Sequence, residues 1–276
     1  MFKLKQNNTT VRTELVAGIT TFMAMAYILM VNAGMFSTLG GDALGASYYN
    51  AVYIATAISA VFGTLLIGLL SNLPLAQASG MGLNAFFVYS VCIGMVDMFD
   101  TLGTLYGACS AGNLLDKDGN VPNMNKAMLA DAAATCFGAV CGTSTVTTFV
   151  ESSAGIAEGG KTGLSSVFTA AMFFIAMFLA PIAALIPSCA TAASLIFVGI
   201  LMIGGVKEID WSDASAAVPA FMTMAIMPFT YNISYGIAFG LISYIFIKLF
   251  TGKIKDISLS TWIIGILFAA MFFIAR

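Results

Sequence analysis

The residues best suited to chemistry in this sequence are four carboxylates that lie inside or beside long apolar stretches, namely Asp97, Asp100, Asp131 and Glu151. An ionisable group at membrane depth costs at least about 2.5–3.5 kcal/mol, so it is expected to face a cavity or a polar partner. The four positions therefore predict a buried polar site rather than a solvated surface. The remaining charged residues lie mostly at loop ends, where we expect them to be solvated.

The composition indicates that these carboxylates lie in a membrane protein. Of 276 residues, 59% are hydrophobic and 9% are charged, whereas a soluble domain carries about 25% charged residues. This excludes a soluble enzyme, a nucleic-acid binder and a disordered regulator, and predicts an integral protein of the lipid bilayer. The sequence contains no His, so proton chemistry falls to the carboxylates. The five cysteines form no CxxC pair, and we expect free thiols and no metal site.

Glu151 ends the most specific of these signals, the segment 142–151. Its β-branched Thr and Val residues favour a short extended segment over a helix. Extended backbone at membrane depth is tolerated only where it lines protein or water. Short, Gly-interrupted elements with polar tips are typical of a transporter site near the bilayer midplane, so we expect Glu151 to be functional.

The three aspartates are open to more than one interpretation. Asp97 and Asp100 are three residues apart and share one helix face. We expect one of them to bind a ligand and the other to contact the helix bundle. Asp131 lies between two alanines, and its position is equally consistent with a bond across a close helix contact and with a functional role.

One amide and two aromatic residues complete the set of candidates. Asn84 follows two glycines that let backbone approach a ligand, and its amide can both donate and accept hydrogen bonds. Phe99 and Phe149 adjoin the candidate carboxylates Asp100 and Glu151, which makes them the best stacking residues in the sequence.

The elements that must position these groups are eight or nine membrane segments. They are predicted at about residues 14–32, 51–70, 81–109, 126–141, 162–186, 190–205, 216–227, 231–250 and 259–275. Several are shorter than the roughly 20 residues that a full crossing needs. Residues 113–125 form the one clearly aqueous loop, and Glu208–Asp213 is predicted to be interfacial. Lys3, Lys5 and Arg12 place the N-terminus in the cytoplasm, while the side of the C-terminus stays open.

Several of these segments together match one family. The runs 14–28, 80–87, 97–105, 142–163, 209–213 and 219–240 are similar to motifs of AzgA-like purine permeases, a branch of the nucleobase and ascorbate transporter group. The resemblance covers essentially the whole chain. It implies a transporter rather than an enzyme, with no cofactor, in the cell membrane.

The resemblance also implies a mechanism and a fold. The activity would be proton-coupled uptake of hypoxanthine, guanine or adenine, with Na⁺ left open as the coupling ion. The fold would be all-α, with two inverted seven-span repeats, a core domain and a gate domain. Its substrate would lie between two half-helices that each follow a short strand.

Residue by residue, the resemblance places Asn84 in the first half-helix, Asp100 in the helix that opens the second repeat, and Glu151 at the second strand and half-helix. A purine N–H edge can donate to a carboxylate, and an asparagine amide completes the pattern. Glu151 and Asp100 are therefore predicted to bind the purine jointly. A buried carboxylate can also exchange a proton, and the coupling residue stays open between these two.

The chain is short for this fold. Residues 1–95 are predicted to form a truncated first repeat of three membrane elements, and 96–276 a second repeat with core elements to about 162 and gate elements beyond. Spans four to seven of the family are missing. Asn84 and Asp100 are only 16 residues apart, about 24 Å along a straight helix. Either the chain breaks around Gly94 or the two residues cannot meet at one ligand.

Two interpretations of function follow. The first is a purine–proton symporter, with a homo-oligomer supplying the missing gate surface. The second is an internally deleted remnant that inserts but does not transport, because alternating access needs one domain to move against another. The retained site residues favour the first interpretation, and the missing gate elements favour the second.

Overall fold

A computed structural model describes residues 2–37, 41–80, 93–179, 196, 199–200, 203–230, 232–254 and 257–274. The chain divides into two compact units. The first comprises Met1–Met81 and Met98–Gly204, and the second comprises Gly82–Asp97 and Gly205–Arg276. Helices dominate the described residues of both units, which confirms the predicted all-α class.

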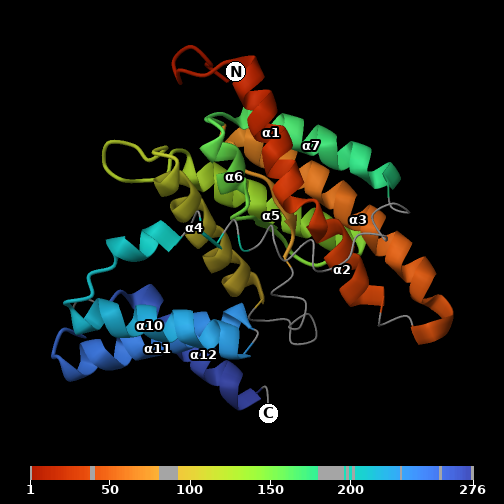
Figure 1. Cartoon of the computed structure of the whole chain (residues 1–276). Coiled ribbons are helices and arrows are strands. Elements are labelled where there is room, and N and C mark those ends of the chain that lie inside the picture. Colours follow the sequence, from red (N-terminus) through yellow and green to blue (C-terminus); the bar gives the residue numbers. More distant parts are fainter. Residues whose placement is uncertain are drawn as a thin grey trace. The chain divides into compact units, whose positions relative to one another are not determined.

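The first unit contains helices from both halves of the sequence (Figure 1). They are α1 (Val11–Met25), α2 (Tyr27–Ser37), α3 (Gly41–Leu70), α4 (Ile93–Ala111), α5 (Met124–Cys141), α6 (Ser152–Ala157), α7 (Gly163–Ala176) and the 3-10 helix η3 (Met177–Leu179). The first residues of α4, up to Asp97, belong to the second unit. The predicted repeat boundary between residues 95 and 96 therefore falls inside α4.

Two short strands lie at the centre of the first unit. Strand β1 (Gln77–Ser79) pairs antiparallel with β2 (Val146–Thr148), and Gln77 lies opposite Thr148. All six strand residues are buried. The Gly80 N–H extends the pairing to the Thr145 carbonyl at 2.7 Å. The predicted extended segment within 142–151 is thus confirmed, and α6 follows it after a short turn.

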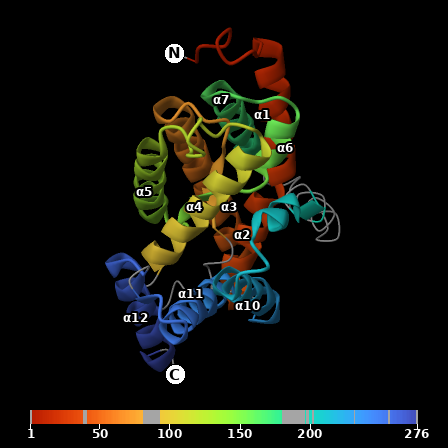
Figure 2. The same cartoon turned by 90° about the vertical axis from the view of Figure 1, so that its left-hand side faces the viewer.

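Helix α3 is the element on which this unit is assembled. It packs against α2, α5, α7 and β1, while α1 packs against α6 and α7 (Figures 1 and 2). Small residues permit these close approaches. A methyl group added at Gly163 of α7 would collide with the carbonyl of Gly68 in α3, and one at Gly18 in α1 would lie 2.6 Å from the Ser165 carbonyl.

Glu14 is hydrogen-bonded to the start of α7, and its position differs from the prediction. Glu14 was expected in a solvated position, but its side chain is fully buried. It accepts hydrogen bonds from the backbone N–H groups of Lys161 (3.2 Å) and Thr162 (3.4 Å), and from the Ser165 hydroxyl (2.5 Å). A carboxylate here satisfies free N–H groups where a helix begins. Glu14 thereby joins α1 to α7.

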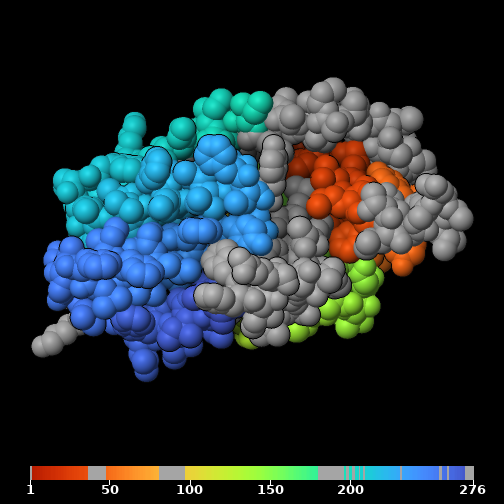
Figure 3. Space-filling view, turned by 90° about the horizontal axis from the view of Figure 1, so that it is seen from below, coloured from red at the N-terminus to blue at the C-terminus, as the bar shows by residue number. Residues whose placement is uncertain are grey.

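The second unit is an assembly of apolar helices. After the 3-10 helix η4 (Ile203–Glu208) come α10 (Ala214–Thr230), α11 (Ile233–Phe250) and α12 (Leu259–Ile274). The side chains of α10, α11 and α12 form one continuous block in the cyan-to-blue part of Figure 3. Gly236 and Gly240 face α10 so closely that a methyl group at either would meet Met227 or Thr223.

Three segments of the described chain are long and apolar enough to cross a membrane: Val11–Phe36, Tyr48–Leu70 and Ile233–Phe250. Shorter apolar helices lie at Gly163–Leu179, Ala214–Thr230 and Thr261–Ala270. These segments coincide with predicted spans, and they make the chain a multi-pass membrane protein. The predicted span at 190–205 lies largely outside the described residues.

Candidate functional site

Glu151 lies where the strand pair meets the short helix α6. It occupies the N-cap position of α6, and its side chain is 2% exposed. The Tyr27 hydroxyl donates a hydrogen bond of 2.5 Å to Glu151 Oε1. The other carboxylate oxygen, Oε2, is buried and has no hydrogen-bond partner among the described residues. A buried acceptor without a donor is rare in folded proteins and marks a place where a ligand or water can bind.

Asp100 contacts strand β2, which ends three residues before Glu151. The Thr147 hydroxyl lies 3.4 Å from Asp100 Oδ2 and 2.9 Å from the Thr101 hydroxyl. Thr147 lies on β2, four residues before Glu151. The structure therefore places Asp100, one of the two carboxylates predicted to bind the base, against the strand that leads to the other, Glu151. Their role in binding stays a prediction.

Asp131 has a different environment. Its Oδ1 accepts hydrogen bonds from Gln77 Nε2 at 2.9 Å and from the Thr101 hydroxyl at 2.8 Å. Gln77 Nε2 also lies 3.2 Å from the Thr148 hydroxyl. Asp131 thus links α5 to α4 and to the strand pair, and these contacts support the structural interpretation of this residue. Asp97 is buried as well, with 5% of its surface exposed.

A second group of polar side chains was not singled out from the sequence. Asn32 Nδ2 donates to the hydroxyls of Thr56 (2.7 Å) and Thr143 (3.1 Å), and the hydroxyls of Thr143 and Ser79 are 2.7 Å apart. This group ties α2 and α3 to both arms of the strand pair. Its signal in the sequence was weak, because single Asn and Thr residues in apolar helices are common and their partners lie far along the chain.

The remaining candidates contribute less to the described geometry. Phe149 is half-buried and packs against an apolar cluster that includes Tyr27 and Phe173. Phe99 is half-buried on α4, and the predicted stacking role of both phenylalanines stays a prediction. Asn84 lies outside the described residues. Helix α4 begins at Ile93, one residue before Gly94, and residues 81–92 lie outside the described residues. The alternative of a chain break around Gly94 therefore stays a prediction.

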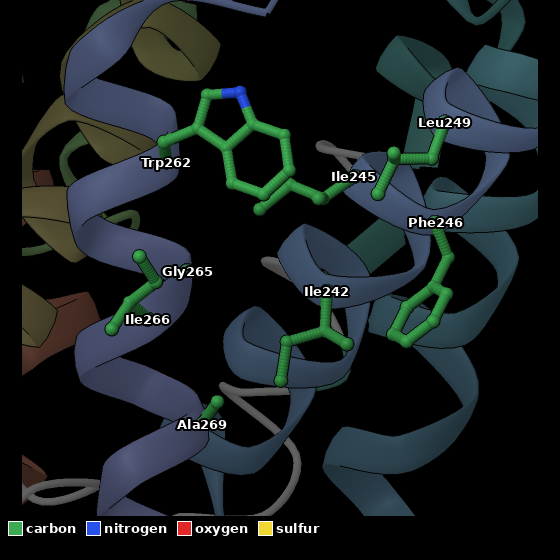
Figure 4. A pocket seen from close by; sticks show the side chains of 8 residues that line it. All are labelled: Ile242, Ile245, Phe246, Leu249, Trp262, Gly265, Ile266 and Ala269. Carbon is green, nitrogen blue, oxygen red and sulfur yellow. The ribbon is translucent and has the colours of Figure 1, made fainter. Parts of the chain in front are cut away.

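An apolar pocket lies elsewhere, between α11 and α12 of the second unit (Figure 4). Its lining residues are all apolar or aromatic, and the Trp262 ring lies at one end of the pocket. Small polar ligands need a few precisely placed polar groups for orientation. The carboxylates of the first unit provide such groups, and this pocket does not.

Comparison with known proteins decides the family. The profile of a permease family matches residues 86–239, which is more than half of the chain. The chain belongs to this permease family. Its members are transporters, so the expectation of transport rather than catalysis is confirmed, as is the resemblance to AzgA-like purine permeases.

Three relatives show how the permease aligns with longer proteins. It is 28% identical to the adenine permease AdeQ of Escherichia coli over 425 positions, covering 98% of this chain and 94% of AdeQ. It is 30% identical to the putative permease MJ0326 of Methanocaldococcus jannaschii over 428 positions, covering 98% and 97%. It is 43% identical to the guanine/hypoxanthine permease PbuO of Bacillus subtilis over 182 positions, covering 65% and 42%.

The AdeQ alignment confirms that the permease is shorter than its relatives. Its 425 positions far exceed the 276 residues of this chain, although nearly all of both proteins is aligned. About 150 positions of AdeQ therefore have no counterpart here. Because the alignment reaches almost from end to end of both proteins, the unmatched positions lie inside it. Their position next to Met95 stays a prediction.

Proposed function

We propose that the permease carries purine nucleobases across the cell membrane by proton symport, with Glu151 and Asp100 as the residues that bind the base. The observation that carries this proposal is the geometry of Glu151. Its Oε1 accepts from a hydroxyl donor, while its buried Oε2 has no donor among the described residues, and Glu151 lies within the residues that the family profile matches.

The chemistry of a purine fits this acceptor. An N–H of the base can donate to Glu151 Oε2, and a second N–H can donate to Asp100. We expect Asn84 to complete the hydrogen-bond pattern from the first half-helix. The names of the relatives specify adenine in AdeQ and guanine or hypoxanthine in PbuO, and this supports a purine as the substrate.

The coupling ion follows from the same carboxylates. A carboxylate held away from water carries a charge only at a cost, so a proton that Glu151 or Asp100 exchanges during the substrate-binding cycle is the simplest coupling. Na⁺ is the alternative ion. The basic residues Lys3, Lys5 and Arg12 support an N-terminus in the cytoplasm.

The shorter chain requires a source for the missing gate surface. We propose a homo-oligomer in which neighbouring copies provide it. The alternative is a remnant that inserts into the membrane without transporting, and the unmatched positions in the AdeQ alignment favour that alternative.

Uptake of radiolabelled hypoxanthine, guanine and adenine in a host without purine uptake tests the proposal. We expect uptake by the native chain, and a loss of tenfold or more in Glu151→Gln, because hydrogen bonds to charged groups contribute about 1.5–3 kcal/mol. Glu158→Gln is the matched control, since Glu158 ends the same helix α6 and is exposed. Its uptake should equal that of the native chain.

The amount of each variant in the membrane must be measured alongside uptake. A protonophore should abolish uptake, and replacing Na⁺ with choline should leave it unchanged; the reverse result would assign the coupling to Na⁺. Background uptake by a native chain that is abundant in the membrane would support the remnant and refute transport.

A further inference from the structure

The geometry points to a role for Tyr27 in the first membrane span. We propose that Tyr27 is a positioning residue, which holds Glu151 Oε1 so that Oε2 is presented to the nucleobase. This inference rests on the proposed function, because it assumes that Glu151 binds the base. Tyr27 lies in the family-like run 14–28, but it was not among the predicted site residues, and it is 124 positions from its partner.

Tyr27 itself is held firmly. It is 4% exposed and belongs to the apolar cluster that also contains Ile28, Leu29 and Phe173. It is the first residue of α2, directly after the interruption at Ala26 that separates α2 from α1. A ring fixed by packing on all sides places its hydroxyl at a defined point, which is the requirement for a residue that orients another.

The direction of this hydrogen bond limits what Tyr27 can do. The Tyr27 hydroxyl donates to Glu151 Oε1 over 2.5 Å. The Tyr27 hydroxyl has a single proton, and that proton is committed to Glu151. Tyr27 therefore orients the carboxylate and does not donate to the substrate.

The consequence for Glu151 is an asymmetric carboxylate. Because Oε1 accepts the hydrogen bond from Tyr27, rotation of the carboxylate group is restricted, and Oε2 points in one fixed direction. Without the Tyr27 hydroxyl, Oε1 would lose this donor, Oε2 would still have none among the described residues, and the carboxylate could rotate. The base would then meet an acceptor whose direction is no longer fixed, and its binding would weaken.

Tyr27→Phe tests this role, because it removes the hydroxyl and keeps the ring. Tyr53→Phe is the matched control. Tyr53 is 2% exposed and donates its hydroxyl to the Ala176 carbonyl at 2.9 Å, so this change also deletes one buried tyrosine hydrogen bond in the same unit. In hypoxanthine uptake we expect Tyr27→Phe to raise KM about tenfold or more with Vmax within about twofold. Tyr53→Phe should leave KM unchanged.

Equilibrium binding of radiolabelled hypoxanthine to the purified full chain separates this inference from transport. We expect the Kd of Tyr27→Phe to rise in parallel with its KM. If the native chain binds hypoxanthine but does not take it up, transport is refuted. The role of Tyr27 is then tested by comparing the Kd of Tyr27→Phe with that of the native chain. An unchanged Kd in Tyr27→Phe would overturn the role of Tyr27, and so would a fall in Vmax and thermal stability at unchanged KM. A native chain that neither binds nor transports would overturn both proposals.

Discussion

Two buried carboxylates of the first unit differ in how completely they are bonded. Asp131 Oδ1 accepts from both Gln77 and Thr101, whereas Glu151 Oε2 has no donor among the described residues. A carboxylate oxygen with two internal donors stabilises the fold, and one without a donor is available to a ligand. This difference supports a structural role for Asp131 and a binding role for Glu151.

Replacing Asp131 should therefore affect stability. In Asp131→Ala the buried donors of Gln77 and Thr101 lose an acceptor, at a cost of about 1–3 kcal/mol for each group left unsatisfied. We expect a lower midpoint of thermal unfolding in detergent, measured by fluorescence-detected size exclusion. Asp131→Asn keeps the accepting oxygen and should be affected less. Equal midpoints for Asp131→Ala and the native chain would argue against the structural role.

The close contact of α6 with α1 governs how rigidly Glu151 is held. Gly155 of α6 faces α1, and a methyl group there would collide with the Thr21 hydroxyl and the Ala17 carbonyl. This contact keeps the short helix in place beside the span that carries Tyr27. The helix is only six residues long, so packing against α1, rather than its own hydrogen bonds, must stabilise it.

Gly155→Ala should separate the two helices. Overpacking of this kind costs about 1–3 kcal/mol, and we expect both a lower thermal midpoint and weaker hypoxanthine binding. Gly103→Ala in α4 is the control, because no described atom lies within 4 Å of an added methyl group there. That change should leave binding intact and alter stability by no more than about 1 kcal/mol. Normal binding by Gly155→Ala would show that α6 can shift without harm.

The sequence predicted elements better than it predicted their partners. The main apolar spans and strand β2 follow from hydrophobic length and from the β-branched run before Glu151. The resemblance implied a short strand before the half-helix predicted to contain Asn84, but it gave that strand no bounds. Strand β1 could not be located from its own residues, because Gln77, Ala78 and Ser79 include no β-branched or aromatic residue and become extended by pairing with β2.

In the candidate site, too, the sequence predicted the residues better than it predicted their partners. The sequence drew attention to Asp100 and Glu151, and the structure places Asp100 in contact with the strand that leads to Glu151. The contacts of Tyr27 with Glu151 and of Glu14 with Ser165 could not be predicted, since each joins residues more than a hundred positions apart. Sequence reasoning identifies a group with unusual chemistry, but only the fold reveals which neighbour satisfies it.

At the scale of the whole molecule, the AdeQ positions that have no counterpart in this chain should affect transport and binding differently. The strand pair, α6 and the helices around them form one compact unit, so the chain retains the framework that holds Asp100 and Glu151. About 150 positions of AdeQ have no counterpart. If these positions provide gate surface and no binding residues, their loss should limit the rate of alternating access and leave the affinity for the base unchanged.

Inserting the unmatched AdeQ segment between Met95 and Val96 tests this separation. At equal abundance in the membrane we expect the enlarged chain to have a higher Vmax for hypoxanthine than the native chain and the same KM, because gate elements change the rate of cycling rather than the contacts with the base. Glu151→Gln in the enlarged chain should abolish the gain, which would show that the insert brings no site of its own. A change in KM at constant Vmax would instead mean that the missing segment carries part of the binding site.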